Sequence, residues 1–197
     1  VKMLRGVDVS ENNGIVDWGR VALGLDFAII RIGYGRNHLD SQFYNNINGA
    51  LTAGLKIGIY HYSYALLPER AQEEARFVVE TLADCGLSPE KLEMGIWFDM
   101  EDADGYKQRH GMPSRQEITA MCSEFICECN RSGYSCGIYA SLDWLEHQIA
   151  TEQLASYVPY WVAQWGGRCD WPNASMWQYT DGYYVDGKEF DGNLYFD

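Results

Sequence analysis

Short apolar runs alternate with amphipathic segments along the 197 residues, and this alternation constrains the fold more than any other feature. Eight runs have the length and composition of buried strands. They are Arg5–Val9, Asp26–Ile32, Ile57–Tyr62, Gly95–Asp99, Cys136–Ala140, Tyr160–Gln164, Met176–Tyr179 and a last segment near Phe190–Phe196. Strands that alternate with helices are typical of a parallel α/β fold.

A helical pattern follows each of the first five strand candidates. The clearest helix begins at Ser114, where Glu117 three residues later completes a capping box, and it ends at Ser132-Gly133. The other helical patterns cover Phe43–Leu51, Ala71–Leu82 and, more weakly, about Trp18–Leu25 and Leu142–Leu154. The chain up to Leu154 therefore resembles five strand–helix units.

The spacing between strands changes near the C-terminus. Eleven residues separate Gln164 from Met176, whereas a parallel crossover needs about a dozen or more. A helix does not fit there, so loops or hairpins join the last three strands. We predict one domain over residues 1–197, folded as an irregular eight-stranded β/α barrel, (β/α)5(β)3. A doubly wound sheet is the alternative, but the shortened C-terminal spacing favours closure.

An apolar strand runs directly into acidic residues at Asp99-Met100-Glu101. Residues two apart in a strand point to the same side, so Asp99 and Glu101 are predicted to project together from the carboxyl end of a barrel strand, where barrel enzymes carry their active sites. Two close carboxylates raise the pKa of one of them, and a carboxyl that keeps its proton can donate it to a leaving oxygen. An acidic loop that caps the next segment is the simpler interpretation.

Two further acids end the first and last strands. Asp8 lies in the apolar run Gly6–Ser10, and Asp191 lies near the final strand. A lone aspartate at a strand end usually forms a turn. In a closed barrel, however, the first and last strands are neighbours, so we expect Asp8 and Asp191 to lie side by side near the mouth.

Aromatic and amide side chains lie near the same strand ends. Tyr60 and Tyr62 share one face of the third strand, and His61 points the other way. The other candidates for a sugar groove are Tyr139, Trp161, Gln164 and Trp177. Rings with polar edges suit the apolar faces of sugars, although packing under the loops would explain any one of them.

Composition narrows the possible partners. Asp and Glu number 28 against 15 Lys and Arg, and a net charge of −13 disfavours nucleic acid. No apolar run is long enough to span a membrane, and residues 1–5 have no signal-peptide core, so export would require a signal outside this sequence. The six cysteines form no CxxC pair, and the glycines form no phosphate loop, so we expect neither a metal nor a nucleotide cofactor. Disulfides and buried thiols both fit the cysteine spacing.

Taken together, these strings resemble the glycoside hydrolase family 25 lysozymes, the Chalaropsis-type muramidases. The match runs through Gly6–Ser10, Phe27–Arg31, Gly58–Ser63, Asp99-x-Glu101, Gly137–Ala140, Trp161–Gln164, Trp177–Tyr179 and Asp191–Phe196. Each string is weak alone, but their order and spacing are specific. Six cysteines are more than this family leads us to expect.

The resemblance implies hydrolysis of the β-1,4 bond between N-acetylmuramic acid and N-acetylglucosamine in peptidoglycan, with retention. It implies that Glu101 is the proton donor and that Asp99 is either the nucleophile or the group that orients the substrate's acetamido oxygen. Asp8 and Asp191 would line the catalytic centre, and Arg31, Tyr62 and Trp161 would line the sugar site. We expect an extracellular or wall-associated monomer.

Two other functions fit the same residues. A D-x-E strand end also occurs in chitinases, which cut a related polymer. A catalytically inactive module that binds wall glycans through its aromatic residues is the non-enzymatic alternative, and the intact carboxylates argue against it.

Overall fold

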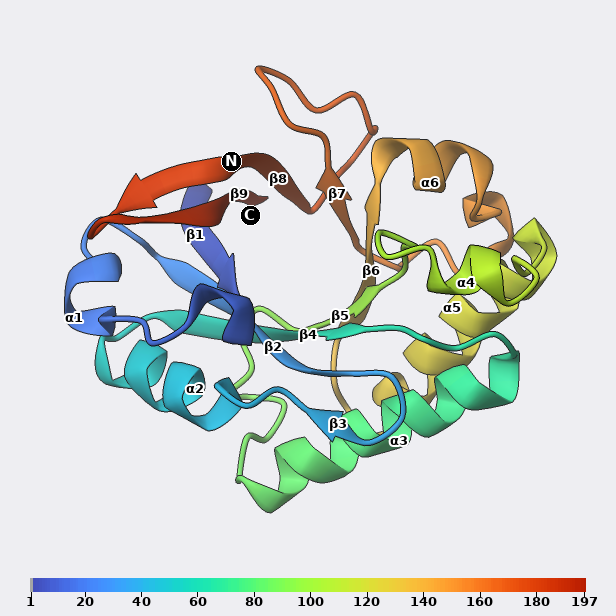
Figure 1. Ribbon diagram of the computed structural model, residues 1–197, viewed down its shortest axis with the longest axis horizontal. Helices are drawn as coiled ribbons and strands as arrows, with labels where there is room; N and C mark the ends of the chain where they lie inside the picture. The colour runs from blue at the N-terminus through green and yellow to red at the C-terminus, as the bar shows by residue number, and fades with distance from the viewer. Residues whose placement is uncertain (1) are drawn as a thin grey trace.

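The computed structural model describes residues 2–197, and its strands form one continuous sheet (Figure 1). The strands are β1 (Met3–Val9), β2 (Phe27–Tyr34), β3 (His38–Leu39), β4 (Lys56–Tyr62), β5 (Ile96–Asp99), β6 (Cys136–Ser141), β7 (Tyr160–Ala163), β8 (Met176–Val185) and β9 (Lys188–Phe196). The helices are α1 (Trp18–Val21), α2 (Phe43–Thr52), α3 (Pro68–Asp84), α4 (Tyr106–Arg109), α5 (Arg115–Arg131) and α6 (Leu142–His147), with 3-10 turns η1 (Glu11–Asn13) and η2 (Thr151–Gln153).

The sheet closes on itself through β1. The strand order is β1-β9-β8-β7-β6-β5-β4-β2, and β1 also pairs with β2, so eight strands form a ring. The short β3 adds to the outer end of β2 only. Strands β1, β2 and β4 to β8 are parallel, whereas β9 is antiparallel to both β8 and β1. The prediction of an irregular eight-stranded β/α barrel is confirmed.

The chain from β7 onward lacks helices, as the short spacing of its strands predicted. A loop without helix joins β7 to β8, and a hairpin joins β8 to β9 (Figure 1). Asp186 and Gly187 form the hairpin turn with positive φ angles of 51° and 76°, which Asp-Gly turns favour. Both strands extend further toward this turn than the sequence indicated, because irregular pairing around Thr180 hides the alternation of β8.

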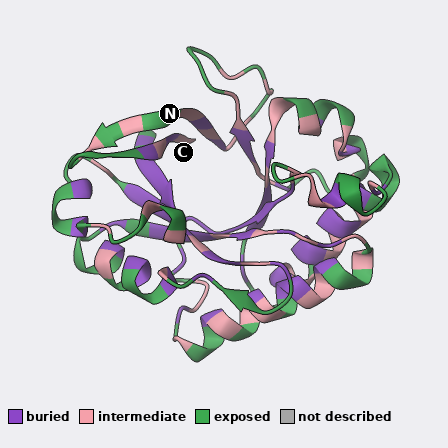
Figure 2. Cartoon of the chain, viewed as in Figure 1, coloured by how far each residue is buried: buried purple, intermediate pink, exposed green. Residues whose placement is uncertain are grey.

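Two apolar clusters lie on the two sides of the barrel wall. One packs the outward faces of the strands against α2, α3 and α5. The other gathers Leu4, Phe27, Trp97, Trp161 and Met176 from five different strands, so it fills the interior. Figure 2 shows the buried residues along the strands and on the helix faces that contact them. This interior cluster forms a floor inside the barrel. Inward-facing residues further along the parallel strands lie above the floor, toward the carboxyl ends of the strands, which form the mouth of the barrel.

Most helix predictions are confirmed, with differences at the ends. Ser114 and Glu117 cap α5 reciprocally, with N···O distances of 3.2 and 2.7 Å. Helix α1 ends early, and Gly24 follows with a φ of +80°. The segment expected as one helix over Leu142–Leu154 is instead α6 followed by η2. Helix α4 was not expected, because its single turn has no apolar periodicity. No helix among residues 2–197 is long and apolar enough to cross a membrane.

Candidate active site

Alternation along the strands brings the four predicted acids into one cavity at the barrel mouth. Asp8 lies four residues after Leu4 and Asp99 two after Trp97, so both point inward above the apolar floor. This cavity, called the pit below, has a volume of about 190 Å³. Its lining consists of Asp8, Asn12, Arg31, Tyr60, Tyr62, Asp99, Glu101, Ala103, Tyr139, Trp161, Gln178 and Asp191.

Asp8 and Asp191 are direct partners in the antiparallel β1–β9 pair. The Oδ2 atom of the buried Asp8 accepts hydrogen bonds from Gln178 Nε2 at 2.9 Å and from Asn193 Nδ2 at 2.8 Å. Burial, and then the charge of Asp191, raises the pKa of Asp8 well above its ordinary value. Burial also raises the pKa of Asp191. The two carboxyls therefore resist being charged together.

The amide of Gln178 is fixed between the acids and two donors. Its Oε1 accepts from Tyr139 Oη at 2.9 Å and from Trp165 Nε1 at 3.1 Å. With the oxygen engaged by two donors, the NH₂ group must face Asp8 and Asp191. Gln178 therefore orients both carboxyls from one side chain.

Asp99 and Glu101 occupy different depths. Asp99 ends β5, is 4% exposed, and has one carboxylate oxygen with no hydrogen-bond partner among residues 2–197. Glu101 lies two residues further, half-buried at the mouth. Burial, followed by the charge of Glu101, raises the pKa of Asp99 well above its ordinary value. The sequence predicted that one of these two carboxyls has a raised pKa, and the raised pKa lies at the deeper Asp99.

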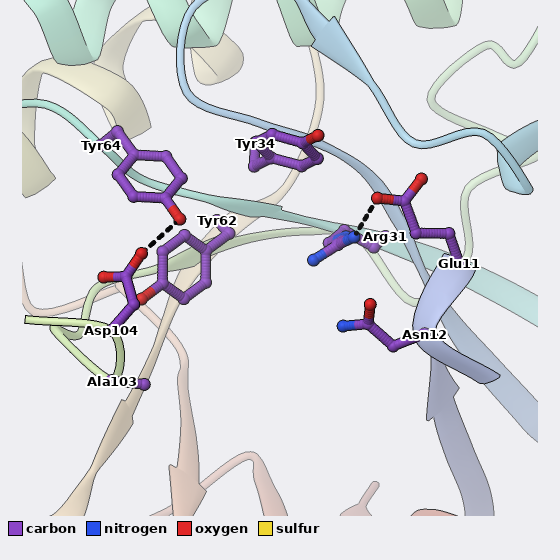
Figure 3. Close-up of a pocket in the computed structure, with 8 residues that line it drawn as sticks. All are labelled: Glu11, Asn12, Arg31, Tyr34, Tyr62, Tyr64, Ala103 and Asp104. Atoms are coloured by element: carbon purple, nitrogen blue, oxygen red, sulfur yellow. Dashed lines mark hydrogen bonds and ion pairs between the residues drawn. The ribbon is translucent and has the colours of Figure 1, made fainter. Parts of the chain in front are cut away.

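Two hollows flank the pit, so the mouth is a groove and not a closed pocket. The larger, of about 480 Å³, is lined by Glu11, Asn12, Arg31, Tyr34, Tyr62, Tyr64, Ala103 and Asp104 (Figure 3). The smaller, of about 200 Å³, is lined by Glu101, Asp102, Ala103, Tyr139, Ser141, Trp144 and Ala163. The pit shares Arg31 and Tyr62 with the first and Glu101 and Tyr139 with the second. A linear polymer could therefore cross the pit with units bound on both sides.

The larger hollow is held open by charged contacts (Figure 3). Arg31 donates to Glu11 at 3.1 Å and to Asp40 at 2.8 Å, and it lies over the ring of Tyr34. On the opposite wall, Tyr64 Oη donates to Asp104 at 2.6 Å. These contacts fix Arg31 and the tyrosine rings before any ligand arrives.

Five of the seven predicted binding residues line the pit: Arg31, Tyr60, Tyr62, Tyr139 and Trp161. Trp161 is only 1% exposed, and its N–H donates to Asn193 at 2.8 Å, so it forms the floor.

The structure does not place Gln164 or Trp177 in the pit. Gln164 lies past the end of β7, and its side-chain amide bonds Asp170 across the β7–β8 loop at 2.6 and 2.7 Å. Trp177 alternates with the inward Met176 and Gln178, so it faces outward, and its N–H donates to Gln164 O at 2.7 Å.

Sequence reasoning missed several residues around the pit. Gln178 and Asn193 lie in the segments Trp177–Tyr179 and Asp191–Phe196, which carry the family resemblance. Counting alternate residues from the inward-facing floor residues could have identified both. Trp165, Tyr34 and Tyr64 lie in or beside loops, where alternation gives no signal.

Two observations bear on cofactors and thiols. Among residues 2–197, no group of three or more His, Cys, Asp or Glu side chains is placed to hold a metal ion. All six cysteines are free thiols, and three of them, Cys122, Cys129 and Cys136, are buried.

A β/α barrel with paired carboxyls at its mouth and an open, aromatic-lined groove has the architecture of a glycoside hydrolase. The chain belongs to the glycosyl hydrolases family 25, whose family model matches residues 7–188.

The chain is similar in sequence to two curated proteins and in fold to a solved structure. The chain is 25% identical over 195 residues to "Lysozyme M1" of Streptomyces globisporus, which covers 95% of this chain and 65% of that protein. It is 27% identical over 194 residues to the "Autolytic lysozyme" of Clostridium acetobutylicum, covering 97% of this chain and 55% of that protein. The structure of the modular autolysin LytC from Streptococcus pneumoniae superimposes with a TM-score of 0.84 at 23% identity, over 98% of this chain and 47% of that one. The chain thus spans only about half to two-thirds of these relatives' lengths.

Proposed function

We propose that this chain is a muramidase that hydrolyses the β-1,4 bond between N-acetylmuramic acid and N-acetylglucosamine in peptidoglycan, with retention. Family membership and the two relatives named as lysozymes support the substrate class. The observation that carries the proposal is the position of Glu101, whose side chain lines both the pit and the smaller hollow, with Asp99 buried behind it.

Glu101 is the proposed proton donor. It is the acid of this pair that lies at the mouth, where a glycosidic oxygen bound across the groove can reach it. As the bond breaks, Glu101 gives its proton to the leaving oxygen. Its carboxylate then takes a proton from the water that completes the reaction, because the acid of the first step serves as the base of the second.

Asp99 is proposed to orient the substrate's acetamido group. Its raised pKa favours the neutral form, which is a weak nucleophile but can accept or donate a hydrogen bond. The acetamido oxygen would then attack the anomeric carbon, and water would open the resulting ring. Two inversions at the same carbon give retention. Asp8 and Asp191 would stabilise the positive charge that develops on the sugar.

Substrate would bind along the groove through Arg31, Tyr60, Tyr62 and Tyr139, above the floor formed by Trp161. We further propose that residues 1–197 are one catalytic domain, that it acts as a monomer, and that it works outside the cell or in the wall. The groove is complete within this single chain, which is consistent with a monomer.

Mass spectrometry of a borohydride-reduced digest of purified peptidoglycan tests the bond that is cut. Reduced muramic acid at the new ends is expected, and reduced N-acetylglucosamine would reject the assignment. Faster cleavage of chitin oligomers would favour a chitinase. Tight glycan binding without products would indicate an inactive binding module.

Glu101→Gln tests the proton donor. We expect the rate to fall by about 10²–10⁴, as for loss of a general acid. The matched control is Glu146→Gln on the exposed face of α6, which should leave the rate unchanged. An active Glu101→Gln enzyme would remove Glu101 from this role.

A further inference from the structure

Lys107 on α4 is a buried lysine whose ammonium group contacts the main chain of Glu101 in the candidate active site. Its side chain is 1% exposed, although lysines are almost never fully buried. The Nζ atom donates to the main-chain oxygen of Ser63 at 2.7 Å and to that of Glu101 at 2.7 Å. It also lies 5.8 Å from the centre of the Tyr62 ring. Lys107 therefore joins the segment after β4 to the segment after β5.

The contact to Glu101 matters because little else holds this part of the main chain. Strand pairing stops just before it: Ser63 N donates to Asp99 O at 3.1 Å, and Met100 N donates to Tyr139 O at 3.0 Å. Within residues 2–197, the bond from Lys107 is the one hydrogen bond recorded for the main chain of Glu101. The main chain of the proposed proton donor is thus hydrogen-bonded through a single buried ammonium group, directly after the last strand-like contact at Met100.

The surroundings of Lys107 are acidic on several sides. Glu74 faces it from α3, Asp99 from β5, and Glu101 and Asp102 from the loop that follows, while the neutral Tyr62 and Cys122 face it from β4 and α5. Each of these acids favours the charged lysine, and burial opposes it and lowers the pKa of Lys107. An unpaired buried charge would be costly, so these contacts compensate for its desolvation.

Glu74 completes the buried network on the far side. Its carboxylate accepts from Ser63 Oγ at 2.8 Å and from Tyr64 N at 2.9 Å. Helix α3, the end of β4 and the loop after β5 are therefore connected through Glu74, Ser63 and Lys107. Loss of the Lys107 ammonium group would remove the hydrogen bond to the main chain of Glu101, whereas Asp102 would keep its bonds from Lys107 N at 2.7 Å and Gln108 N at 3.0 Å.

We infer that Lys107 is a positioning residue for the proposed cleavage, because it fixes the main chain of Glu101 at the mouth and supplies the buried positive charge that faces the Asp99–Glu101 pair. The inference rests on the proposed function. Misplacement of a reacting group by about 1 Å can cost about 100-fold in rate, so an indirect contact of this kind can control catalysis. Removal of the cation also disfavours ionised carboxyls nearby.

The test compares Lys107→Met with Lys107→Gln, which loses the charge but keeps a donor for a carbonyl. The matched control is Lys91→Met, because the exposed Lys91 also donates to a main-chain oxygen, Gly86 O at 3.0 Å, away from the pit. We measure kcat, KM and the thermal midpoint of all three, and kcat/KM against pH. Carbon-13 NMR titration follows the side-chain carboxyls of Asp99 and Glu101 without substrate.

For Lys107→Met we expect kcat to fall roughly 10- to 100-fold with KM within a few-fold. The alkaline limb of the pH profile, where the donor carboxyl loses its proton, should move up by about one unit. Lys107→Gln should show the same pH shift with a smaller loss of kcat. Lys91→Met should match the unmodified protein in every measurement.

An unmoved pH profile and unmoved carboxyl titrations would overturn the inference, because they would make Lys107 a packing residue. It is also overturned if neither Lys107 variant folds while Lys91→Met does, since Lys107 would then be needed for folding. A protein that leaves peptidoglycan uncut rejects the proposed function instead, and the NMR titration still decides the effect of Lys107 on the acids.

Discussion

Asp8 and Asp191 lie opposite each other across β1 and β9, although 182 residues separate them in the chain. One side chain, that of Gln178, donates to both carboxyls, at 2.9 Å and 3.5 Å. Burying these two acids side by side lowers the free energy of unfolding when they are ionised. Their charge state can therefore be followed by measuring stability against pH.

Asp8→Asn should stabilise the protein at neutral and higher pH. The pKa of Asp8 is raised on folding, so the stability linked to its protonated form is fully present below the unfolded value and is lost as pH rises through the folded value. Asparagine stays neutral and keeps one oxygen for the amide donors. We expect a gain on the order of 1 kcal/mol at pH 8 and little difference near pH 3 in urea unfolding. Asp84→Asn on the protein surface is the control, and a pH-independent gain would contradict the argument.

Acetamido assistance predicts that the substrate's N-acetyl groups are required. De-N-acetylated peptidoglycan should be cut at least about 100-fold more slowly, and chemical re-acetylation should restore cleavage, because the attacking oxygen is removed and then replaced. The release of reducing ends measures both steps. Equal cleavage of acetylated and de-acetylated walls would instead favour direct attack by Asp99.

The larger hollow should contribute binding more than chemistry. Tyr34→Ala removes a ring that lies beneath Arg31 and beside Tyr64. We expect KM for long glycans to rise about tenfold, or ~1.4 kcal/mol, with kcat nearly unchanged. Tyr157→Ala is the control, because this exposed tyrosine precedes β7 at the opposite end of the barrel. A large fall in kcat for Tyr34→Ala would assign the ring a role in the reaction itself.

The capping box of α5 should affect stability alone. Ser114→Ala removes the acceptor for Glu117 N, and we expect a loss of about 1 kcal/mol without a change in specific activity. Ser123→Ala, within the same helix and with no recorded side-chain hydrogen bond among the described residues, should be neutral or slightly stabilising. Thermal unfolding measures both, and equal midpoints for the two variants would contradict the role of the cap.

The parts of the site that follow from strand alternation and ring closure could be predicted. Asp99 and Glu101 share a side because they are two residues apart at a strand end. Asp8 and Asp191 meet because the first and last strands of a closed barrel are neighbours. Both arguments use only the period of a strand and the topology.

The parts that depend on loops could not be predicted. Gln164 lies just past the end of β7, where alternation no longer fixes direction, and Trp177 was chosen for its ring although Gln178 is the inward residue. Lys107 gives no sequence signal at all, because its single helical turn has no apolar periodicity and an isolated lysine is expected in solvent. The depth of each acid, and with it the raised pKa of Asp99, depends on side-chain packing.

The antiparallel entry of β9 between β8 and β1 has a consequence for how activity is lost. Half of the acid pit rests on contacts that span nearly the entire chain, and such long-range contacts are slow to form in folding. Release of this one strand would dismantle the pit while the five strand–helix units stay intact. On heating, enzymatic activity should therefore be lost at a lower temperature than the helical circular dichroism signal.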